Sequence, residues 1–357
     1  MIKPEKSLIP SLNGLRAICI LFVICHHLDI VTGVFQVIKK NYWLKPLGDL
    51  ITDGQLGVNV FFIISGFLIT KLLLKEEKNH QTISLKFFFY RRALRIFPAY
   101  YFVLFIYFTL QIFNIIKLSE ASWLTSLTYN KYFNWREDMI SSHFWSLSIE
   151  EHFYIFWPLI FLLGNKSRKI TTILIIISVP LVRVYLFYFP IPWVNSLTIF
   201  LRADALSTGC FIALYFNEIM ILFKKHLQKT FWISLLCLVF IRYAPSLLEY
   251  NSFRFIFIPL GTSFGTLANI FIGFIILYSV YGPKNTVYKI LNSKILNHIG
   301  VLSYSLYLWQ QIFIFGGDYW FTIFPYNLIL TYIFALISYY SIEKYFLKFK
   351  SKFTPST

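Results

Sequence analysis

The segment LNGLRAICILFVICHHL, residues 12–28, decides the fold class of this chain. It opens an apolar run that continues to about residue 35, and a transmembrane helix needs about 20 mostly apolar residues. Its apolar side chains follow one another without the alternation of barrel strands, so the segment predicts a membrane-spanning helix. The whole chain is 57% hydrophobic and only 14% charged. Because a soluble domain carries about 25% charged residues, this composition excludes a soluble enzyme, a secreted disulfide scaffold and a disordered protein.

Similar apolar runs recur along all 357 residues. We therefore predict an all-α fold: a polytopic integral membrane helix bundle of about ten transmembrane helices. The bundle is expected to form a single domain over residues 1–357, with no separate soluble domain. The predicted spans are 12–35, 57–74, 97–116, 144–163, 170–189, 203–222, 230–243, 255–281, 301–320 and 326–347.

The chain is strongly basic, with 33 Lys and Arg against 16 Asp and Glu and a net charge of +17. In a chain this apolar the excess indicates topology, because Lys and Arg accumulate in cytoplasmic loops. With both termini in the cytoplasm, the cytoplasmic segments hold more than twice as many Lys and Arg residues as the opposite side. We therefore predict cytoplasmic termini and no nucleic-acid partner. The four cysteines lack metal-ligand spacing, so no metal site is predicted.

The first predicted span places a cation and an imidazole on one face of a helix. Arg16 and His27 are eleven residues apart, which corresponds to a difference of about 20° in direction and about 16 Å along the axis. His26 points away from that face. A substrate with anionic phosphates at one end and a reactive group on a long arm fits this spacing. Alternatively, Arg16 is a cytoplasmic anchor and His27 a core histidine with a hydrogen-bond partner.

Three arginines precede the third predicted span in FFFYRRALRIFPAYY, residues 87–101. Arg91 and Arg95 share a face one turn apart, Arg92 lies beside them, and Pro98 starts or kinks the span. Guanidinium groups at a cytoplasmic membrane surface suit phosphate binding, because each offers a bidentate donor fork. The alternative is an ordinary topology anchor that contacts lipid phosphates.

The segment HFWSLSIEEHFYIFWP, residues 143–158, carries two adjacent carboxylates. Glu150 and Glu151 are expected at the outer end of the fourth span. A carboxylate near a deep histidine can orient the imidazole or balance its charge. The alternative is a structural ion pair with Arg183 or Arg202.

Other polar side chains also fall in or beside apolar segments. Asn59, in the second predicted span, is a buried polar group that needs a partner. Arg202 and Asp204 lie at the outer mouth of the sixth span. There they can hydrogen-bond a polar acceptor or pair with other charges.

The segment GVLSYSLYLWQQ, residues 300–311, places several hydrogen-bonding side chains in one span. Ser303, Tyr304 and Gln310 can form a polar lining, although hydrogen bonding between helices is the usual role of such residues. Near the last inner boundary, Glu343 is followed by Lys344 and is expected to form a surface or interface pair.

Five sequence blocks, in this order, resemble the membrane-bound acyltransferase family 3, whose members are bacterial O-acyltransferases that modify carbohydrates. The resemblance covers about residues 8–347. Five blocks in one order on one topology are far more specific than any single block. The blocks are Arg16 with His27, Gly57–Ile69, Arg91–Pro98, Trp145–Glu150 and Gly300–Trp309.

The chain departs from the family pattern at two positions. Asn59 stands where the family commonly has Asp, which removes a possible charge partner for the arginines or His27. Gln310 stands where the family commonly has His, although Gln still donates and accepts hydrogen bonds.

The resemblance implies transfer of an acyl group, most often acetyl, from cytoplasmic acyl-coenzyme A to a hydroxyl of a cell-surface or lipid-linked carbohydrate. The implied location is the bacterial cytoplasmic membrane. Acyl-coenzyme A is then a co-substrate, and no permanently bound cofactor is expected. A transporter or flippase of a lipid-linked saccharide is the alternative, since it uses intramembrane charges as a path. Against it, the sequence shows no repeat halves.

The hypothesis gives each candidate residue a role. His27 is the general base or forms an acyl-histidine intermediate, and Glu150 or Glu151 orients the base or the acceptor. The remaining roles are coenzyme phosphate binding by Arg16, Arg91, Arg92 and Arg95, and acceptor or oxyanion contacts by Asn59, Arg202, Asp204, Ser303, Tyr304 and Gln310.

Overall fold

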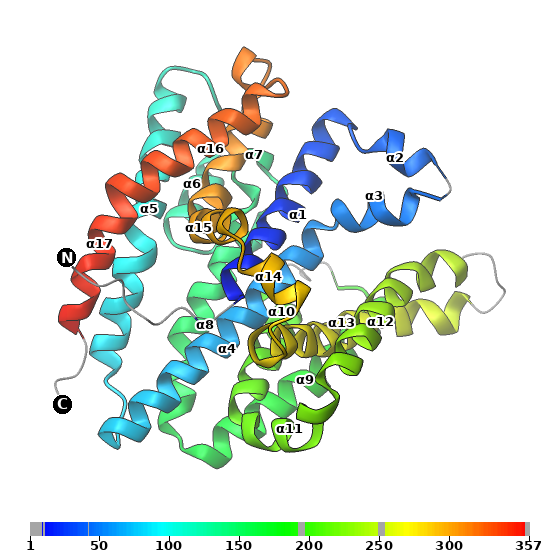
Figure 1. Cartoon of the computed structure of the whole chain (residues 1–357). Helices are drawn as coiled ribbons and strands as arrows, with labels where there is room; N and C mark the ends of the chain where they lie inside the picture. Colours follow the sequence, from blue (N-terminus) through cyan, green and yellow to red (C-terminus); the bar gives the residue numbers. More distant parts are fainter. Residues whose placement is uncertain (1–8, 10, 42, 192–196, 249–253, 354–357) are drawn as a thin grey trace. The chain divides into compact units, whose positions relative to one another are not determined.

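The computed structural model describes residue 9 and residues 11–41, 43–191, 197–248 and 254–353. Every regular element within these residues is a helix and none is a strand, which confirms the predicted all-α class (Figure 1). Both chain ends, which the sequence predicts to be cytoplasmic, lie outside the described residues.

The described helices vary from single turns to 28 residues. The α-helices are α1 (Leu12–Thr32), α2 (Gln36–Lys40), α3 (Lys45–Ile51), α4 (Gly54–His80), α5 (Leu85–Ile112), α6 (Glu120–Leu127), α7 (Met139–Ser142), α8 (Phe144–Leu162), α9 (Asn165–Tyr188), α10 (Thr198–Leu214), α11 (Phe216–Phe223), α12 (Leu227–Leu248), α13 (Arg254–Tyr281), α14 (Thr286–Leu291), α15 (Lys294–Phe315), α16 (Tyr326–Ser338) and α17 (Lys344–Phe349). The other helical turns are η1 (Lys131–Phe133), η3 (Lys224–His226), η4 (Trp320–Thr322), the π-helical η5 (Tyr339–Glu343) and η6 (Lys350–Phe353).

Every predicted span overlaps a helix, and the chain is a multi-pass membrane protein. Among the described residues, four single helices (α1, α4, α5 and α9) are long and apolar enough to cross a bilayer, and a bent pair would add a fifth. The count of ten spans therefore remains a prediction.

The predicted span 203–222 is wrong as a single straight helix. The chain bends by 78° between Thr198–Leu214 and Phe216–Ile241. Charged groups lie at this bend. The Lys169 ammonium is 4.4 Å from the centre of the Tyr215 ring and 3.7 Å from a carboxylate oxygen of Glu218. These groups favour water or headgroups over hydrocarbon, which explains why the apolar run does not continue straight.

Helix α5 begins twelve residues before the predicted span 97–116. Ser84 caps it, since its side chain accepts a hydrogen bond from the Phe87 amide, and the helix continues past Pro98. The three arginines of the basic motif therefore lie within a long helix, whereas the sequence placed them in the preceding loop.

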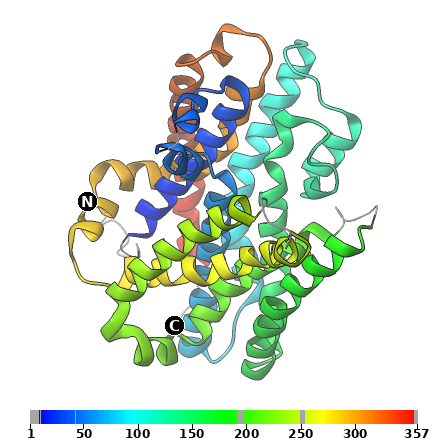
Figure 2. The same ribbon diagram turned by 90° about the vertical axis from the view of Figure 1, so that its right-hand side faces the viewer.

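The chain divides into two compact units. The first contains Met1–Ile18, Asn59–Leu72 and Leu159–Gly300. Within it α12 and α13 run side by side (Figures 1 and 2).

A pair of glycines brings two helices of the first unit into contact. A Cβ on Gly66 of α4 would lie 2.0 Å from the Leu206 carbonyl oxygen, and a Cβ on Gly209 of α10 would lie 2.1 Å from that of Ile63. Gly66 therefore permits the close approach of α4 and α10.

The second unit contains Cys19–Val58, Leu73–Pro158 and Val301–Thr357. Its residues include all of α5 and most of α1, α8 and α15. These helices carry the basic motif, the histidine, the acid pair and the polar lining, respectively. Helix α17 lies beside α5 in this unit (Figure 1).

Candidate functional site

His27 is held by two adjacent glutamines of α15. Its Nδ1 lies 3.2 Å from Oε1 of Gln310, and Nε2 of Gln311 lies 3.3 Å from its Nε2. An amide oxygen only accepts, so Nδ1 carries the proton and donates it to Gln310. The lone pair is then on Nε2, and Nε2 of Gln311 lies near both ring nitrogens, 3.3 Å from Nε2 and 3.5 Å from Nδ1. The contact with Gln310 therefore supports the tautomer in which Nε2 is the basic atom.

Two amide atoms beside His27 are buried and have no hydrogen-bond partner among the described residues. They are Nε2 of Gln310 and Oε1 of Gln311, and both side chains are 0% exposed. A buried polar group without a partner costs about 1–3 kcal/mol. Such atoms grouped around a basic nitrogen indicate a place where a polar ligand binds. The edge of the Phe315 ring faces the imidazole, with centroids 5.7 Å apart.

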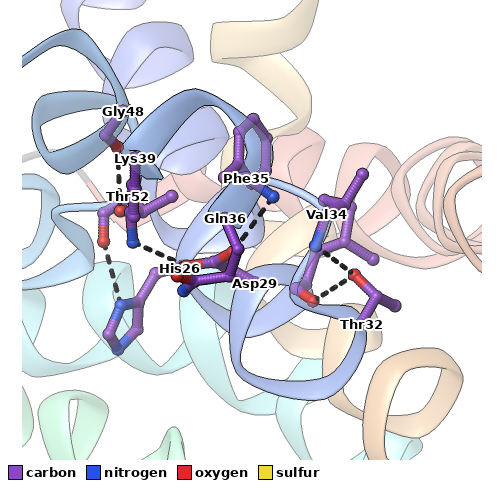
Figure 3. A network of polar contacts seen from close by, with 10 residues as sticks. His26, Asp29, Thr32, Val34, Phe35, Gln36, Lys39, Gly48 and Thr52 are labelled. Atoms are coloured by element: carbon purple, nitrogen blue, oxygen red, sulfur yellow. Dashed lines mark hydrogen bonds and ion pairs between the residues drawn. The ribbon is translucent and has the colours of Figure 1, made fainter. Parts of the chain in front are cut away.

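The neighbouring His26 has a structural role. Its Nδ1 donates to the Thr52 carbonyl oxygen at 2.9 Å, and its side chain packs against Gly54 (Figure 3). One turn along α1, the Asp29 carboxylate is 2.6 Å from the Lys39 ammonium of α2. These contacts fasten the end of α1 to the α2–α3 segment.

The arginines of the basic motif have different surroundings. Arg91 is paired, because it lies 2.6 Å from the Glu76 carboxylate and donates to the Phe353 carbonyl oxygen at 2.7 Å. Arg92 lies with its guanidinium 5.2 Å from the centre of the Tyr154 ring and 5.7 Å from that of Phe88. The charge of Arg91 is therefore balanced within the protein.

The acid pair lies near the basic motif. The Tyr154 hydroxyl donates to Glu150 at 3.4 Å, and Glu151 interacts electrostatically with Arg92. The sequence expected the acids at the outer end of a span and the arginines in a cytoplasmic loop. That separation is wrong, because α5 extends back to Leu85 and carries Arg92 into the helical region of this unit.

Asp204 belongs to a closed network in the first unit. Its carboxylate lies 2.9 Å from Arg183 and accepts from Thr266 at 2.6 Å and from Asn269 at 3.1 Å. Asp204 is 0% exposed. Of the two roles open for it in the sequence, the structure supports pairing with another charge. The same contact gives Arg183 an acid partner other than Glu150 or Glu151.

Ser303 and Tyr304, the other candidates on α15, differ in their bonding. The Ser303 hydroxyl is buried and has no partner among the described residues. The Tyr304 hydroxyl donates to the Ile96 carbonyl oxygen of α5 at 3.0 Å. Ser303 therefore keeps a free donor, whereas Tyr304 connects two helices.

The expected surface pair of Glu343 and Lys344 is wrong. Glu343 is only 6% exposed and its carboxylate accepts from the Ser305 hydroxyl, whereas the Lys344 ammonium lies 5.0 Å from the centre of the Tyr340 ring. Glu343 ends the π-helical turn η5, and a π turn changes the direction of side chains relative to an α-helix.

The remaining candidates belong to the first unit. Arg16 is half-buried on α1, the uninterrupted helix that also carries His27, and Asn59 is half-buried on α4. Arg202 is half-buried on α10. The sequence analysis placed Gln311 only within the polar segment 300–311 and assigned no role to His143, which is 1% exposed. The adjacent glutamines and the histidine before Trp145 were the available signals.

These features define a class: a multi-pass membrane protein with a buried polar site centred on a histidine. A family model described as an acyltransferase domain matches residues 9–342, so the chain belongs to this acyltransferase family. The motifs that resembled acyltransferase family 3 are thus confirmed.

Curated relatives carry related names. The peptidoglycan O-acetyltransferase OatA of Listeria monocytogenes is 28% identical over 333 residues, covering 86% of this chain and 49% of the relative. The O-acetyltransferase OatA of Staphylococcus aureus (strain NCTC 8325) is 32% identical over 372 residues, covering 94% of this chain and 56% of the relative. The chain spans about half the length of these relatives. No solved structure is significantly similar to it.

Proposed function

We propose that the protein is an O-acetyltransferase that moves an acetyl group from acyl-coenzyme A to a hydroxyl of a cell-envelope carbohydrate. The observation that carries this proposal is the contact between His27 and the two glutamines, which leaves Nε2 as a base beside unpaired amide atoms. A base in fixed orientation is what deprotonation of a hydroxyl requires.

In the proposed reaction, the acceptor hydroxyl takes the place of the Gln311 amide at Nε2 of His27. Nε2 accepts the hydroxyl proton as the oxygen attacks the thioester carbonyl carbon. The free Nε2–H of Gln310 donates to the oxyanion that forms. Gln310 thus both orients the base and stabilises charge. A covalent acyl-histidine is the alternative route through the same nitrogen.

The donor's phosphates are assigned to the basic motif. Arg91 has an internal acid partner, so Arg92 and Arg95, three residues apart on α5, carry more of this role. The sequence resemblance also assigns phosphate binding to Arg16, on the same helix as His27. Glu150 and Glu151, close to Arg92, hold that guanidinium in place or position the acceptor.

The acceptor and the location are proposed from the relatives and the family. The Listeria relative is named for peptidoglycan, and the relatives are named O-acetyltransferases, so a carbohydrate of the bacterial envelope and an acetyl group are the first candidates. We place the chain in the bacterial cytoplasmic membrane, with the acceptor outside.

The test uses the full chain in membrane vesicles with radiolabelled acetyl-coenzyme A and envelope carbohydrate. We expect labelled carbohydrate and free coenzyme A thiol in equal amounts, both lost in His27→Ala. The matched control is His226→Ala, which alters an exposed histidine. Transfer at the normal rate by a folded His27→Ala protein would refute the mechanism. Movement of a saccharide without thiol release would favour a transporter.

A further inference from the structure

A second imidazole lies close to the candidate site. His143, between α7 and α8, is 1% exposed, and neither of its ring nitrogens makes a hydrogen bond of regular geometry among the described residues, although the Leu308 backbone of α15 lies near enough to interact with the ring. A neutral imidazole has one N–H donor and one acceptor nitrogen. Leaving both unpaired in an apolar interior is costly, and each such group in a folded protein needs an explanation.

The backbone and ring of His143 make defined packing and hydrogen-bond contacts, although the ring nitrogens themselves make no hydrogen bond of regular geometry. The ring lies 4.1 Å, centroid to centroid, from that of Phe144 and 5.4 Å from that of Tyr307. The Tyr307 hydroxyl donates to the His143 carbonyl oxygen at 2.7 Å. The ring therefore has a defined position, and its polar atoms are available to a ligand.

One helix positions both histidines. Tyr307, which holds His143, precedes Gln310 by three residues and Gln311 by four on α15, and residues at these spacings share a helix face. His143 and His27 are close enough to interact electrostatically. The unpaired nitrogens of His143 and the unpaired amide atoms of the two glutamines thus belong to residues that are held on the same stretch of α15.

We propose that His143 is a catalytic residue whose ring N–H donates a hydrogen bond to the carbonyl oxygen of the donor thioester. This role rests on the proposed function. A purely packing role for the ring is the competing explanation, and a phenylalanine would fill it equally well.

The proposed step is an addition to the thioester carbonyl followed by loss of the coenzyme A thiol. The acceptor oxygen bonds to the thioester carbon while its proton passes to Nε2 of His27. The carbonyl π electrons move to the oxygen, and this oxyanion accepts hydrogen bonds from His143 and Gln310. When the carbonyl reforms, the carbon–sulfur bond breaks and the sulfur takes the electron pair. The proton on His27 then passes to the sulfur, while His143 keeps its own proton throughout.

The first experiment compares His143→Phe with His143→Gln in steady-state acetyl transfer. Phe keeps the ring packing and removes the donor, whereas Gln keeps an N–H donor. We expect His143→Phe to lower kcat by about 100- to 1,000-fold, with little change in KM for acetyl-coenzyme A, and His143→Gln to recover at least tenfold of that loss. The control is His152→Phe on α8, whose Nδ1 already bonds the Ser148 carbonyl oxygen at 2.8 Å.

A second measurement reads the hydrogen bond without turnover. In His27→Ala protein loaded with acetyl-coenzyme A labelled with carbon-13 at the carbonyl, the infrared carbonyl stretch of bound thioester should lie below its position in solution. Adding His143→Phe should reduce this shift to the part that Gln310 causes, and adding His143→Gln should restore some of the lost part. A packing role does not move this band.

Two outcomes would overturn the inference. One is an unchanged kcat in His143→Phe. The other is an equal loss in both His143 variants, accompanied by lower thermal midpoints and an unaltered carbonyl band. Failure of the proposed function looks different, because the parent protein would then transfer no acetyl group and His27→Ala would change nothing.

Discussion

The side-chain amide of Gln310 determines which nitrogen of His27 can accept a proton. An imidazole that is free to rotate or to change tautomer presents its lone pair in the right place only part of the time. Here the Gln310 oxygen, 3.2 Å from Nδ1, holds the proton there and leaves Nε2 basic. A carbonyl oxygen in this position does for the imidazole what a carboxylate does in many catalytic triads.

Replacing Gln310 with Leu should therefore impair chemistry more than binding. We expect kcat for acetyl transfer to fall by about 10- to 100-fold, because the imidazole would no longer be held in the tautomer that can act as the general base. The KM for acetyl-coenzyme A should stay within about threefold of the parent value. Gln228→Leu, at an exposed position, is the control. A Gln310→Leu protein with parental kcat would show that the amide does not orient the base.

Replacing Arg91 and replacing Arg92 should have different effects. The first change should mainly lower stability, and the second should mainly lower the affinity for the donor. Arg91 and Glu76 are paired at 2.6 Å, with side chains only 14% and 10% exposed. Removing one partner of a buried pair costs about 3–5 kcal/mol, because the other charge is left unpaired. Arg91→Ala should thus lower the thermal midpoint in detergent, and the double change Arg91→Ala with Glu76→Ala should recover part of the loss.

Arg92 has aromatic neighbours and lies near Glu151, without the short ion pair that holds Arg91, so its replacement should lower donor affinity more than stability. We expect Arg92→Ala to raise the dissociation constant of acetyl-coenzyme A by at least tenfold while the binding of dephospho-acetyl-coenzyme A changes less. Calorimetric titration measures both. Unchanged donor affinity in Arg92→Ala would reject its phosphate role.

At the scale of helices, the α4–α10 contact depends on two positions without a side chain. Gly→Ala normally stabilises a helix by about 1 kcal/mol. Gly66→Ala should do the opposite, because the new methyl would lie 2.0 Å from the Leu206 carbonyl oxygen, and overpacking costs about 1–3 kcal/mol. Fluorescence-detected gel filtration after heating should show a lower midpoint for Gly66→Ala than for Leu72→Ala, whose side chain is 48% exposed on the same helix. Equal midpoints would mean that the helices separate easily.

The segment between α5 and α8 is fastened by Lys131. This side chain is 0% exposed, and its ammonium donates to the Ser122 hydroxyl at 2.6 Å. Burial lowers the pKa of Lys131 to about 8, against the opposing attraction of Asp138. Hydrogen bonds from Ser122 and Ser119 outweigh burial and lower the pKa of Asp138.

The lowered pKa of Lys131 determines whether the stability of the protein rises or falls with pH. Its pKa is lower in the folded state than the unfolded value of 10.5, so between about pH 8 and 10.5 the unfolded chain binds more protons and stability rises with pH. The thermal midpoint of the parent protein should therefore rise relative to that of Lys131→Met across this window. Parallel pH profiles for the two proteins would contradict a lowered pKa in the folded state.

For the whole molecule, the sequence predicted those features that depend on a single segment of the chain. Apolar runs predicted the helices, and the spacing of Arg16 and His27 on one helix drew attention to the histidine. The partners of His27 could not be derived in this way, because Gln310 is 283 residues away along the chain. The Arg91–Glu76 pair, the burial of Glu343 and the bend at Tyr215 likewise depend on packing between distant segments.

The asymmetry of charge along the chain predicts from which side the donor enters. Four lysines lie in the sequence within about fifteen residues of the start of α5, namely Lys71, Lys75, Lys78 and Lys86. Such clusters stay in the cytoplasm, which predicts that Arg92 lies toward that side. Acetyl-coenzyme A carries several phosphate charges and does not cross a sealed bilayer. Inverted vesicles, whose cytoplasmic face is outward, should therefore release coenzyme A thiol from added donor, whereas sealed right-side-out vesicles should do so only after detergent is added.

This sidedness test needs a background measurement, because other membrane enzymes also cleave thioesters. Inverted vesicles that contain His27→Ala provide it, since that variant keeps the charge distribution that sets orientation. Equal thiol release by sealed vesicles of both orientations, above this background, would reject a cytoplasmic donor site. It would also require the basic start of α5 to face outward, against the predicted topology, in which the cytoplasmic side holds the excess of Lys and Arg.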